Sequence, residues 1–479
     1  MITRHFINVA NKDGSVRRVH YRRAGEGPPL LMVHQSPRSG AEYEPLMAQW
    51  AAHFTCLAPD SPGFGESGVL PMAAPDVNDY ADAVLAFLDA MGLQRVGAYG
   101  FHSGAITLVT AAKRAPERFW AMAAEGYAVW TDAERADFGA NYTPPYVMSD
   151  FGEHLTWTWH RIREQSWWFP WYAAQDKLRL SMAHDDVAAN HEMVMDVMAA
   201  GPSYALGYQA MLQAARDLPE QGAATPPVFI SGYDGDPLQS HIDRLGDLPP
   251  GWAAQKLKTP ADTKAASLAW LLPKAEVGAV LARAPDDEGY VVVPEWGQLH
   301  WIGDRAAGHV HLHAPGSAAE FVAAAGVLGG VLAVDLPGHG LSDSFDAAPG
   351  LEALVDVLAA ALEPLVTAAV VRVTGEGASA RLAALLAARL GVAADAVPLG
   401  QVAGWPDLTP DRFGSHLTRA WGFARAEAAF EPWDAPSAAT AKALVPEVLA
   451  PERLHRRALA ALRARFVPEL LAALGAGKS

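Results

Sequence analysis

The segment Gly100-Phe101-His102-Ser103-Gly104 constrains the fold more than any other part of this 479-residue chain. It follows an apolar stretch at 95–99 that predicts a buried strand, and it precedes a helical pattern at 105–113. Glycines at both ends of the segment allow a sharp turn from strand to helix and keep side chains away from its centre. The central residue is His102, so the sequence predicts a turn that displays an imidazole at the end of a strand.

The chain before residue 131 alternates between strand and helix patterns. Strands are predicted at 16–23, 29–34, 54–59 and 119–125, and helices at 43–52 and 77–91. Alternation of this kind predicts βαβ units and a parallel sheet. The displayed histidine would then lie at the edge of the sheet where the carboxyl ends of the parallel strands meet.

Residues 131–218 change character, because the apolar periodicity becomes helical and tryptophans gather there. The clustered tryptophans are Trp157, Trp159, Trp167, Trp168 and Trp171. A helical insertion of this kind is expected to cover the displayed histidine. Its tryptophans either line a pocket for an apolar substrate or pack the insertion against the sheet domain. The strand pattern resumes at 227–231.

The second half of the chain repeats parts of the first half in the same order. The segment 335–342 matches 60–67, the segment 375–379 occupies the position of the displayed turn, and 413–421 matches 151–159. Several matches in one order predict a tandem duplication of a core and its helical insertion.

The second copy is expected to be degenerate and truncated. Gly377 stands where the first copy has His102, so this turn offers no side chain for chemistry. His154 recurs as His416, and its retention in a degenerate copy indicates a structural role. No strand or acidic loop follows the helical pattern at 438–474, so the copy would leave a sheet edge exposed. The first domain or a second subunit is expected to cover that edge.

Four pieces of the sequence together resemble the α/β-hydrolase superfamily: the His34 loop, the Asp60 turn, the segment at His102 and the Asp236 loop. The resemblance implies a mostly parallel α/β-hydrolase sheet with a helical cap, followed by a degenerate, truncated second domain of the same type. The expected boundaries are a core at 1–130 and 219–281, a cap at 131–218, a linker at 282–288, a second core at 289–405 and a second cap-like segment at 406–479.

The resemblance assigns catalytic positions in the order nucleophile, acid and histidine. His102 takes the nucleophile position and Asp236 the acid position, with Asp234 as a near alternative. The stretch after the last expected strand, 259–264, contains no histidine. An imidazole at the turn could extend into that gap and reach Asp236, serving as a general base or as a nitrogen nucleophile. The rival interpretation is that His102 only packs at the start of a helix.

The same resemblance implies oxyanion donors and substrate contacts. The backbone N–H groups of Gln35 and Ser103 take the oxyanion positions, and Ser103 is also a candidate nucleophile. Arg38 could meet an anionic group of a substrate or remain solvated. The residues expected to contact substrate are His34, Arg38, Tyr127, Trp157, His160 and Trp168.

The segment His309-Val-His-Leu-His313 places three imidazoles on one face of an expected strand. Such a face could bind a metal ion. It aligns instead with the strand that ends at His34, and no carboxylate motif accompanies it, so neither a metal nor a cofactor is predicted.

Charge and composition exclude several classes of partner. A formal net charge of −16 argues against a nucleic-acid groove, which needs a basic face. No run of about 20 apolar residues indicates a membrane span. The single cysteine, Cys56, lies in an apolar run and is expected to be a core residue in a reducing compartment. With no signal-peptide pattern at the N-terminus, the cytoplasm is the expected location.

These observations predict an atypical, cofactor-free α/β-hydrolase-fold enzyme that cleaves a small apolar carbonyl, ester or lactone-type substrate. His102 would act as base or nucleophile, with Asp236 as its partner. Two alternatives stay open: a non-catalytic pseudo-hydrolase that binds a small ligand or protein, and a cofactor-free lyase of the same fold. The expected partner is a small-molecule substrate, with a homo-oligomer as a further possibility.

Overall fold

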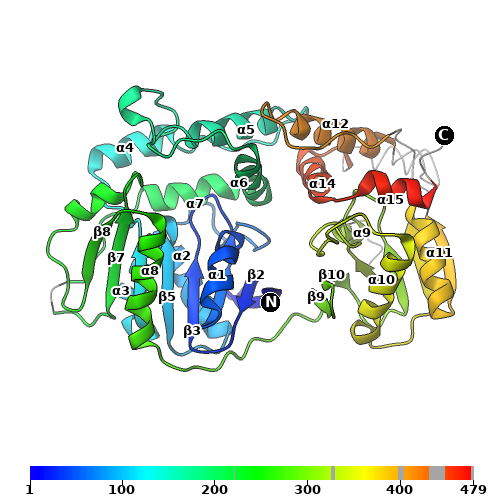
Figure 1. Ribbon diagram of the computed structural model, residues 1–479, viewed down its shortest axis with the longest axis horizontal. Helices are drawn as coiled ribbons and strands as arrows, with labels where there is room; N and C mark the ends of the chain where they lie inside the picture. Colours follow the sequence, from blue (N-terminus) through cyan, green and yellow to red (C-terminus); the bar gives the residue numbers. More distant parts are fainter. Residues whose placement is uncertain (221, 325–329, 398–403, 431–447, 476–479) are drawn as a thin grey trace. The chain divides into compact units, whose positions relative to one another are not determined.

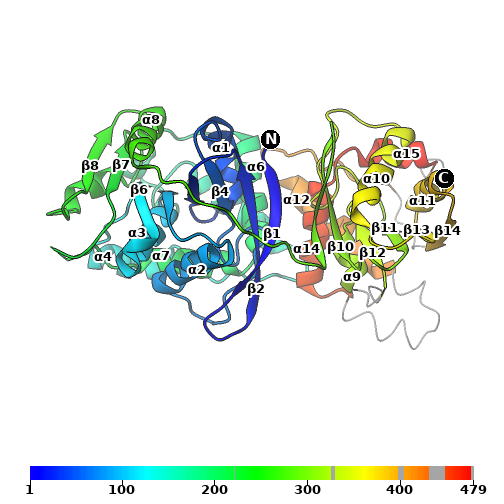
Figure 2. The ribbon, with the colours of Figure 1, turned by 90° about the horizontal axis from the view of Figure 1, so that it is seen from below.

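The computed structural model describes residues 1–479 except 221, 325–329, 398–403, 431–447 and 476–479. The chain divides into two compact units. Unit 1 comprises residues 1–147 and 158–284, and unit 2 comprises residues 148–157 and 285–479. Both units appear in Figures 1 and 2, and each is an α/β structure built around its own sheet.

Unit 1 contains an eight-stranded sheet in the order β1-β2-β4-β3-β5-β6-β7-β8. The strands from β3 to β8 pair in parallel, whereas β1 and β2 are antiparallel to their neighbours. The sheet therefore has the mostly parallel architecture that the sequence predicts. Its strands are β1 Thr3–Ala10, β2 Val16–Ala24, β3 Pro29–Val33, β4 Thr55–Pro59, β5 Val96–Phe101, β6 Phe119–Glu125, β7 Val228–Tyr233 and β8 Ala253–Leu257.

Helices cover both faces of this sheet, which explains why the central strands β3 to β7 read as continuous apolar runs. Figure 2 shows α1 (Glu44–Trp50) and α8 (Pro260–Leu271) on one face, with α2 (Val77–Ala90) and α3 (Ser103–Arg114) on the other. Helix α8 begins directly after β8, because Thr259 caps it and Pro260 takes its first position. Only two residues, Lys258 and Thr259, connect β8 to α8.

The cap consists of α4 (Asp132–Asn141), α5 (Glu153–Gln165), α6 (Val187–Ala200) and α7 (Ser203–Leu212). The helices α4, α6 and α7 belong to unit 1 and lie across one end of its sheet (Figure 1). The first turn of α5, with residues 148–157, groups with unit 2 instead. The helical character expected for 131–218 is present, but the chain leaves unit 1 within this segment.

Unit 2 contains a six-stranded sheet in the order β14-β13-β11-β12-β10-β9. Counted along the chain, this is the order of the first six strands of unit 1, and in the described residues no strand follows β14. The strands are β9 Glu288–Val293, β10 Gly297–Gly303, β11 His309–Leu312, β12 Leu332–Val334, β13 Arg372–Glu376 and β14 Ala393–Val397. The helices are α9 Ala319–Ala324, α10 Leu351–Leu365, α11 Ser379–Leu390, α12 Ser415–Phe430, α14 Pro451–Arg463 and α15 Val467–Leu474. Part of the helical prediction at 438–474, up to residue 447, lies outside the described residues.

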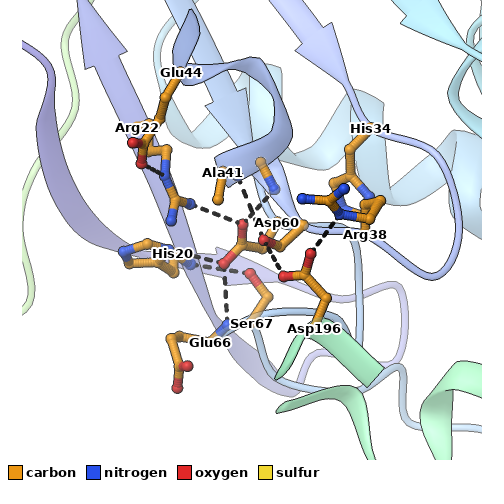
Figure 3. A network of polar contacts seen from close by, with 12 residues as sticks. His20, Arg22, His34, Arg38, Ala41, Glu44, Asp60, Glu66, Ser67 and Asp196 are labelled. Atoms are coloured by element: carbon orange, nitrogen blue, oxygen red, sulfur yellow. Dashed lines mark hydrogen bonds and ion pairs between the residues drawn. The ribbon is translucent and has the colours of Figure 1, made fainter. Parts of the chain in front are cut away.

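A buried polar network organises the turn after β4 in unit 1 (Figure 3). Asp60 accepts the backbone N–H groups of Gly40 and Glu66 at 2.8 and 3.0 Å, and its Oδ2 lies 2.8 Å from His20 Nδ1. Arg22 adds an ion pair with Asp60 at 3.3 Å. The network joins β2, the loop after β3 and the turn at 60–67, so the Asp60 turn is a structural device.

Unit 2 contains the same network at the matching positions. Asp335 accepts from the backbone of Ala319 and Leu341 at 2.7 and 2.8 Å, and its Oδ2 lies 2.8 Å from His300 Nδ1. Since both units keep the histidine–aspartate pair, the match between 60–67 and 335–342 reflects shared packing.

The pair in unit 2 predicts a pH dependence of stability. Burial by itself would lower the pKa of His300, but Asp335 and Glu288 raise it to about 9. A raised pKa stabilises the folded state fully below the unfolded value, and this stabilisation is lost as the pH rises through 9. His300→Gln should therefore lower the unfolding free energy more at about pH 6 than at about pH 10. The two losses should differ by about 1–3 kcal/mol. Urea unfolding of both proteins measures this difference, and a gap independent of pH would contradict the prediction.

The three imidazoles in and directly after β11 contact three separate partners. His309 Nε2 lies 2.6 Å from Thr374 Oγ1, His311 Nε2 lies 3.1 Å from Glu376 Oε1, and His313 Nε2 accepts from Leu336 N at 3.0 Å. The described part of the chain contains no group of three residues arranged to hold a metal ion. Nor does any described helix have the length and apolarity to cross a membrane.

His154 and His416 occupy equivalent places in unit 2. Each is the second residue of a helix, α5 or α12. Each ring accepts the backbone N–H located five residues earlier, Ser149 N at 3.2 Å and Asp411 N at 3.3 Å. His154 also lies 3.0 Å from His455 Nδ1. The recurrence therefore has a structural basis, as the sequence indicates.

Candidate active site

The turn between β5 and α3 displays His102 in a conformation that is unusual for a residue with a side chain. Its backbone angles are φ 48° and ψ −109°, a sparsely populated region that costs about 1–3 kcal/mol. The fold holds it there through His102 N, which donates to Glu125 O at 2.9 Å, and through its carbonyl, which accepts from Ile106 N at 3.1 Å.

The two flanking glycines are required by close packing. A Cβ on Gly104 would lie 1.8 Å from Val33 O, and one on Gly100 would lie 2.7 Å from the carbonyl carbon of Gly104. The sharp turn predicted from the sequence is therefore present, with His102 at its centre.

His102 reaches the acid loop after β7. His102 Nε2 lies 3.1 Å from Asp236 Oδ1, and this oxygen also accepts from Leu238 N at 2.8 Å. The Asp236 side chain is fully buried, whereas the His102 side chain is 22% exposed. The contact expected from the sequence is thus present. Asp234, the alternative acid, accepts from Gln239 Nε2 on an exposed part of the loop.

The environment of Asp236 keeps it ionised. Burial raises the pKa of its carboxyl, but the charge and hydrogen bond of His102 and the N–H of Leu238 outweigh burial and lower the pKa below its ordinary value. An ionised Asp236 accepts the proton on Nε2, so the neutral ring carries its lone pair on Nδ1. This arrangement can orient an imidazole and stabilise its protonated form.

Gly126, which the sequence analysis did not single out, makes room for this pair. It follows β6 with φ 64°, and a Cβ there would lie 2.2 Å from His102 Cδ2 and 3.1 Å from Asp236 Oδ2. A glycine directly after a buried strand was the only signal in the sequence, and it does not reveal which side chains approach it.

Replacing Gly126 by alanine should displace the imidazole, because the new methyl group would overlap the ring. We expect kcat to fall about 10–100-fold, since displacements of about 1 Å cost that much in oriented sites. Binding of a non-reacting substrate analogue should persist. Gly222→Ala is the matched control, because Gly222 also has a positive φ but no neighbour within 4 Å of a Cβ. Equal kcat values for the two variants would contradict the prediction.

A cavity of about 340 Å³ opens beside His102, between the ends of the strands and the cap of unit 1. Polar groups in its wall are few and include Ser103, Gln165, His184 and Tyr233. The apolar and aromatic wall includes Phe101, Trp130, Tyr142, Phe169, Met182, Met193, Tyr208 and Met211. A cavity of this volume and lining suits a small, largely apolar ligand.

The six predicted substrate-contact residues do not line this cavity: His34, Arg38, Tyr127, Trp157, His160 and Trp168. His34 instead accepts from Ser61 N at 2.8 Å, and Arg38 pairs with Asp196 at 2.6 Å (Figure 3). Both side chains are occupied in fixing the loop after β3.

The other four residues have different surroundings. Tyr127 is buried in the core, and His160 is exposed on the cap. Trp157 belongs to the segment that groups with unit 2, and Trp168 packs under Arg179, 4.4 Å from its ring centroid. Sequence position placed these residues near the cap, but the direction of each side chain depends on tertiary packing.

One of the two predicted oxyanion donors, the N–H of Gln35, is engaged within the protein. Gln35 N donates to Glu42 Oε1 at 2.8 Å, and Ser36 N donates to Ser103 Oγ at 3.2 Å. The loop folds back on the short helix Gly40–Tyr43, so Glu42 occupies the N–H that was expected to face a substrate. Ser103 does line the cavity, where its hydroxyl accepts from the loop.

His241 is a further buried histidine close to the acid loop in sequence. Its Nδ1 accepts from Val129 N at 2.9 Å, and burial lowers its pKa to about 4. It is therefore neutral and structural at physiological pH.

Comparison with known proteins identifies the class of this fold. Residues 28–153 match the family profile described as the alpha/beta hydrolase fold. These residues contain β3 to β6, the displayed turn and the start of the cap, so unit 1 has the α/β-hydrolase fold.

Individual relatives are similar over part of their lengths. Haloalkane dehalogenase 2 of Mycobacterium tuberculosis (strain ATCC 25618 / H37Rv) is 33% identical over 104 residues, which are 22% of this chain and 36% of the relative. The 2-hydroxy-6-oxo-6-phenylhexa-2,4-dienoate hydrolase of Comamonas testosteroni is 32% identical over 124 residues, which are 25% of this chain and 43% of the relative. The match thus spans less than half the length of each. The crystal structure of epoxide hydrolase A from Mycobacterium thermoresistibile aligns with 58% of this chain and 100% of its own, with 19% identity and a TM-score of 0.43.

Proposed function

We propose that unit 1 is a cofactor-free enzyme of the α/β-hydrolase fold that cleaves a small, apolar carbonyl, ester or lactone-type substrate. The observation that carries the proposal is the contact between His102 Nε2 and Asp236 Oδ1 at the mouth of an apolar cavity. The similarity to a protein named as a hydrolase supports the same general reaction class.

In this proposal His102 acts through Nδ1. As a general base it removes a proton from the water that attacks the carbonyl carbon, or from the substrate. As a nucleophile it attacks the carbonyl carbon of an ester or lactone, the C–O bond to the alkoxide breaks, and water then hydrolyses the acyl-imidazolium to the acid. In either role the ring becomes positively charged, and the ionised Asp236 stabilises that charge through the Nε2–H bond. The same dyad could instead begin a lyase reaction by removing a proton from the substrate.

One observation favours a second candidate, a non-catalytic protein that binds a small ligand. The N–H groups of Gln35 and Ser36 are both occupied within the protein. An acyl-transfer enzyme needs free donors where the oxyanion develops, so substrate binding would have to displace Glu42 or the Ser103 hydroxyl.

We further propose that unit 2 arose by tandem duplication and has lost its own chemistry. Its matching turn has Gly377 at φ 52°, close to the φ of 48° at His102 but without a side chain. Support of unit 1 or contact with a second copy of the chain is the role proposed for it, in a cytoplasmic protein whose partner is a small molecule.

Assays of the purified full chain against panels of esters, lactones and 1,3-dicarbonyl compounds test the proposal. We expect turnover of at least one compound class without added metal or cofactor. Saturable ligand binding in the cavity with no turnover in any panel would favour the binding protein instead.

A further inference from the structure

Unit 1 contains a second cavity, which borders the cavity beside His102. Its volume is about 670 Å³, and Gln35 and Phe101 contribute to its wall as well as to the wall of the cavity beside His102. The rest of its lining comes from the segment between Arg38 and Trp50 and from the first turns of α8. Pro260, at the start of α8, follows the two-residue connection from β8 and contributes to the wall.

The charged groups around this cavity leave one carboxylate in surplus. Lys264 is committed to Glu125, with Nζ 2.7 Å from Glu125 Oε2. Arg38 is committed to Asp196 at 2.6 Å. Glu42 is half-buried and, within the described residues, forms no ion pair; its two oxygens accept from Gln35 N and Nε2 at 2.8 and 3.1 Å.

The charges around Arg38 support the conclusion that one carboxylate is in surplus. Burial would lower the pKa of Arg38, but Asp196, Glu42 and Glu192 raise it, so a single guanidinium faces three carboxylates. Burial in turn raises the pKa of the Glu42 carboxyl despite nearby His34 and Arg38. A bound cation would offset the cost of keeping the Glu42 carboxylate charged while it is partly buried, because such a carboxylate gains most from a charged donor.

The remaining wall is apolar and partly aromatic, with Tyr43, Leu46, Trp50, Phe101 and Leu268. Aromatic faces attract cations as well as apolar groups. A carboxylate whose oxygens keep further lone pairs can accept the N–H groups of an amine while it holds Gln35.

We propose that this cavity binds a small organic cation, a primary amine on an apolar or aromatic body, with its ammonium group donating to Glu42. The site is separate from the dyad, and binding there requires neither His102 nor turnover. Failure of the proposed enzyme activity would therefore leave it untouched.

Calorimetric titration of the full chain with benzylamine tests the site, with benzyl alcohol as the neutral analogue and benzoate as the anion. We expect benzylamine to bind about tenfold more tightly than benzyl alcohol, the ratio that one charge-assisted contact supports. Glu42→Gln keeps the shape of the side chain and should remove this preference while leaving benzyl alcohol binding within about twofold.

A second variant tests whether benzylamine binds inside this cavity. Ala265 lies on an exposed face of α8 in the wall of this cavity, so Ala265→Trp should fill the space without disturbing the core. Loss of benzylamine binding in Ala265→Trp supports the proposal. Tighter binding of benzoate, an unchanged preference in Glu42→Gln, or benzylamine binding that survives Ala265→Trp would each overturn it.

Discussion

His102→Ala is expected to lower kcat/KM by about 10²–10⁴-fold if His102 is the general base, and by more if it is the nucleophile. The reason is geometric: His102 is the ring that the turn presents to the cavity, and its Nε2 lies 3.1 Å from Asp236 Oδ1. Steady-state kinetics with the best substrate from the panel measures the loss.

His102→Asn is the matched control for the backbone, because asparagine tolerates the positive φ of 48° better than alanine but has no basic nitrogen. Both variants should unfold at nearly the parent temperature and both should lose activity. His102→Ser should not recover esterase activity, since the two residues between β8 and α8 include no histidine to activate a serine. An Asn or Ser variant as active as the parent would remove His102 from the mechanism.

Asp236→Asn is expected to lower kcat by about 10²–10⁴-fold, the range seen when a histidine loses the acid that orients it. The amide preserves the shape of the side chain but cannot stabilise an imidazolium, and it can select the opposite ring tautomer. Because the Asp236 side chain is fully buried, solvent cannot replace its charge.

Asp234→Asn provides a control within the same turn. Asp234 is exposed and bonds to Gln239, so we expect its replacement to change kcat by less than about twofold. Damage from Asp234→Asn without damage from Asp236→Asn would mean that the dyad in solution uses the other carboxylate.

Local signals were sufficient for the fold of unit 1 and for the central pair. The apolar strands at 29–34, 54–59 and 119–125 and the glycines around His102 specify a parallel sheet with a sharp turn after β5. The contact with Asp236 was also predictable, because parallel strands bring their carboxyl ends to one edge and the missing histidine left space between the two residues.

The surroundings of the pair could not be predicted in the same way. Gly126 and Glu42 lie far from Asp236 in the sequence. Gly126 matters because the His102 ring and Asp236 pack against it, and Glu42 matters because it accepts from Gln35 N; both contacts form only in the folded chain. The bond from Gln35 N to Glu42 could not be predicted for the same reason, because a motif describes the backbone of a loop but not the carboxylate that folds back onto it.

The sequence by itself determined the sheet, the displayed His102 and its acid partner, since periodicity and turn chemistry are local properties that survive in a one-dimensional pattern. Tertiary structure alone decided which side chains line the cavity beside His102, whether the N–H of Gln35 is engaged, and that Glu42 lies in the wall of a second cavity. Side-chain direction and charge balance depend on contacts between segments distant in the chain, and such contacts exist only after packing is complete.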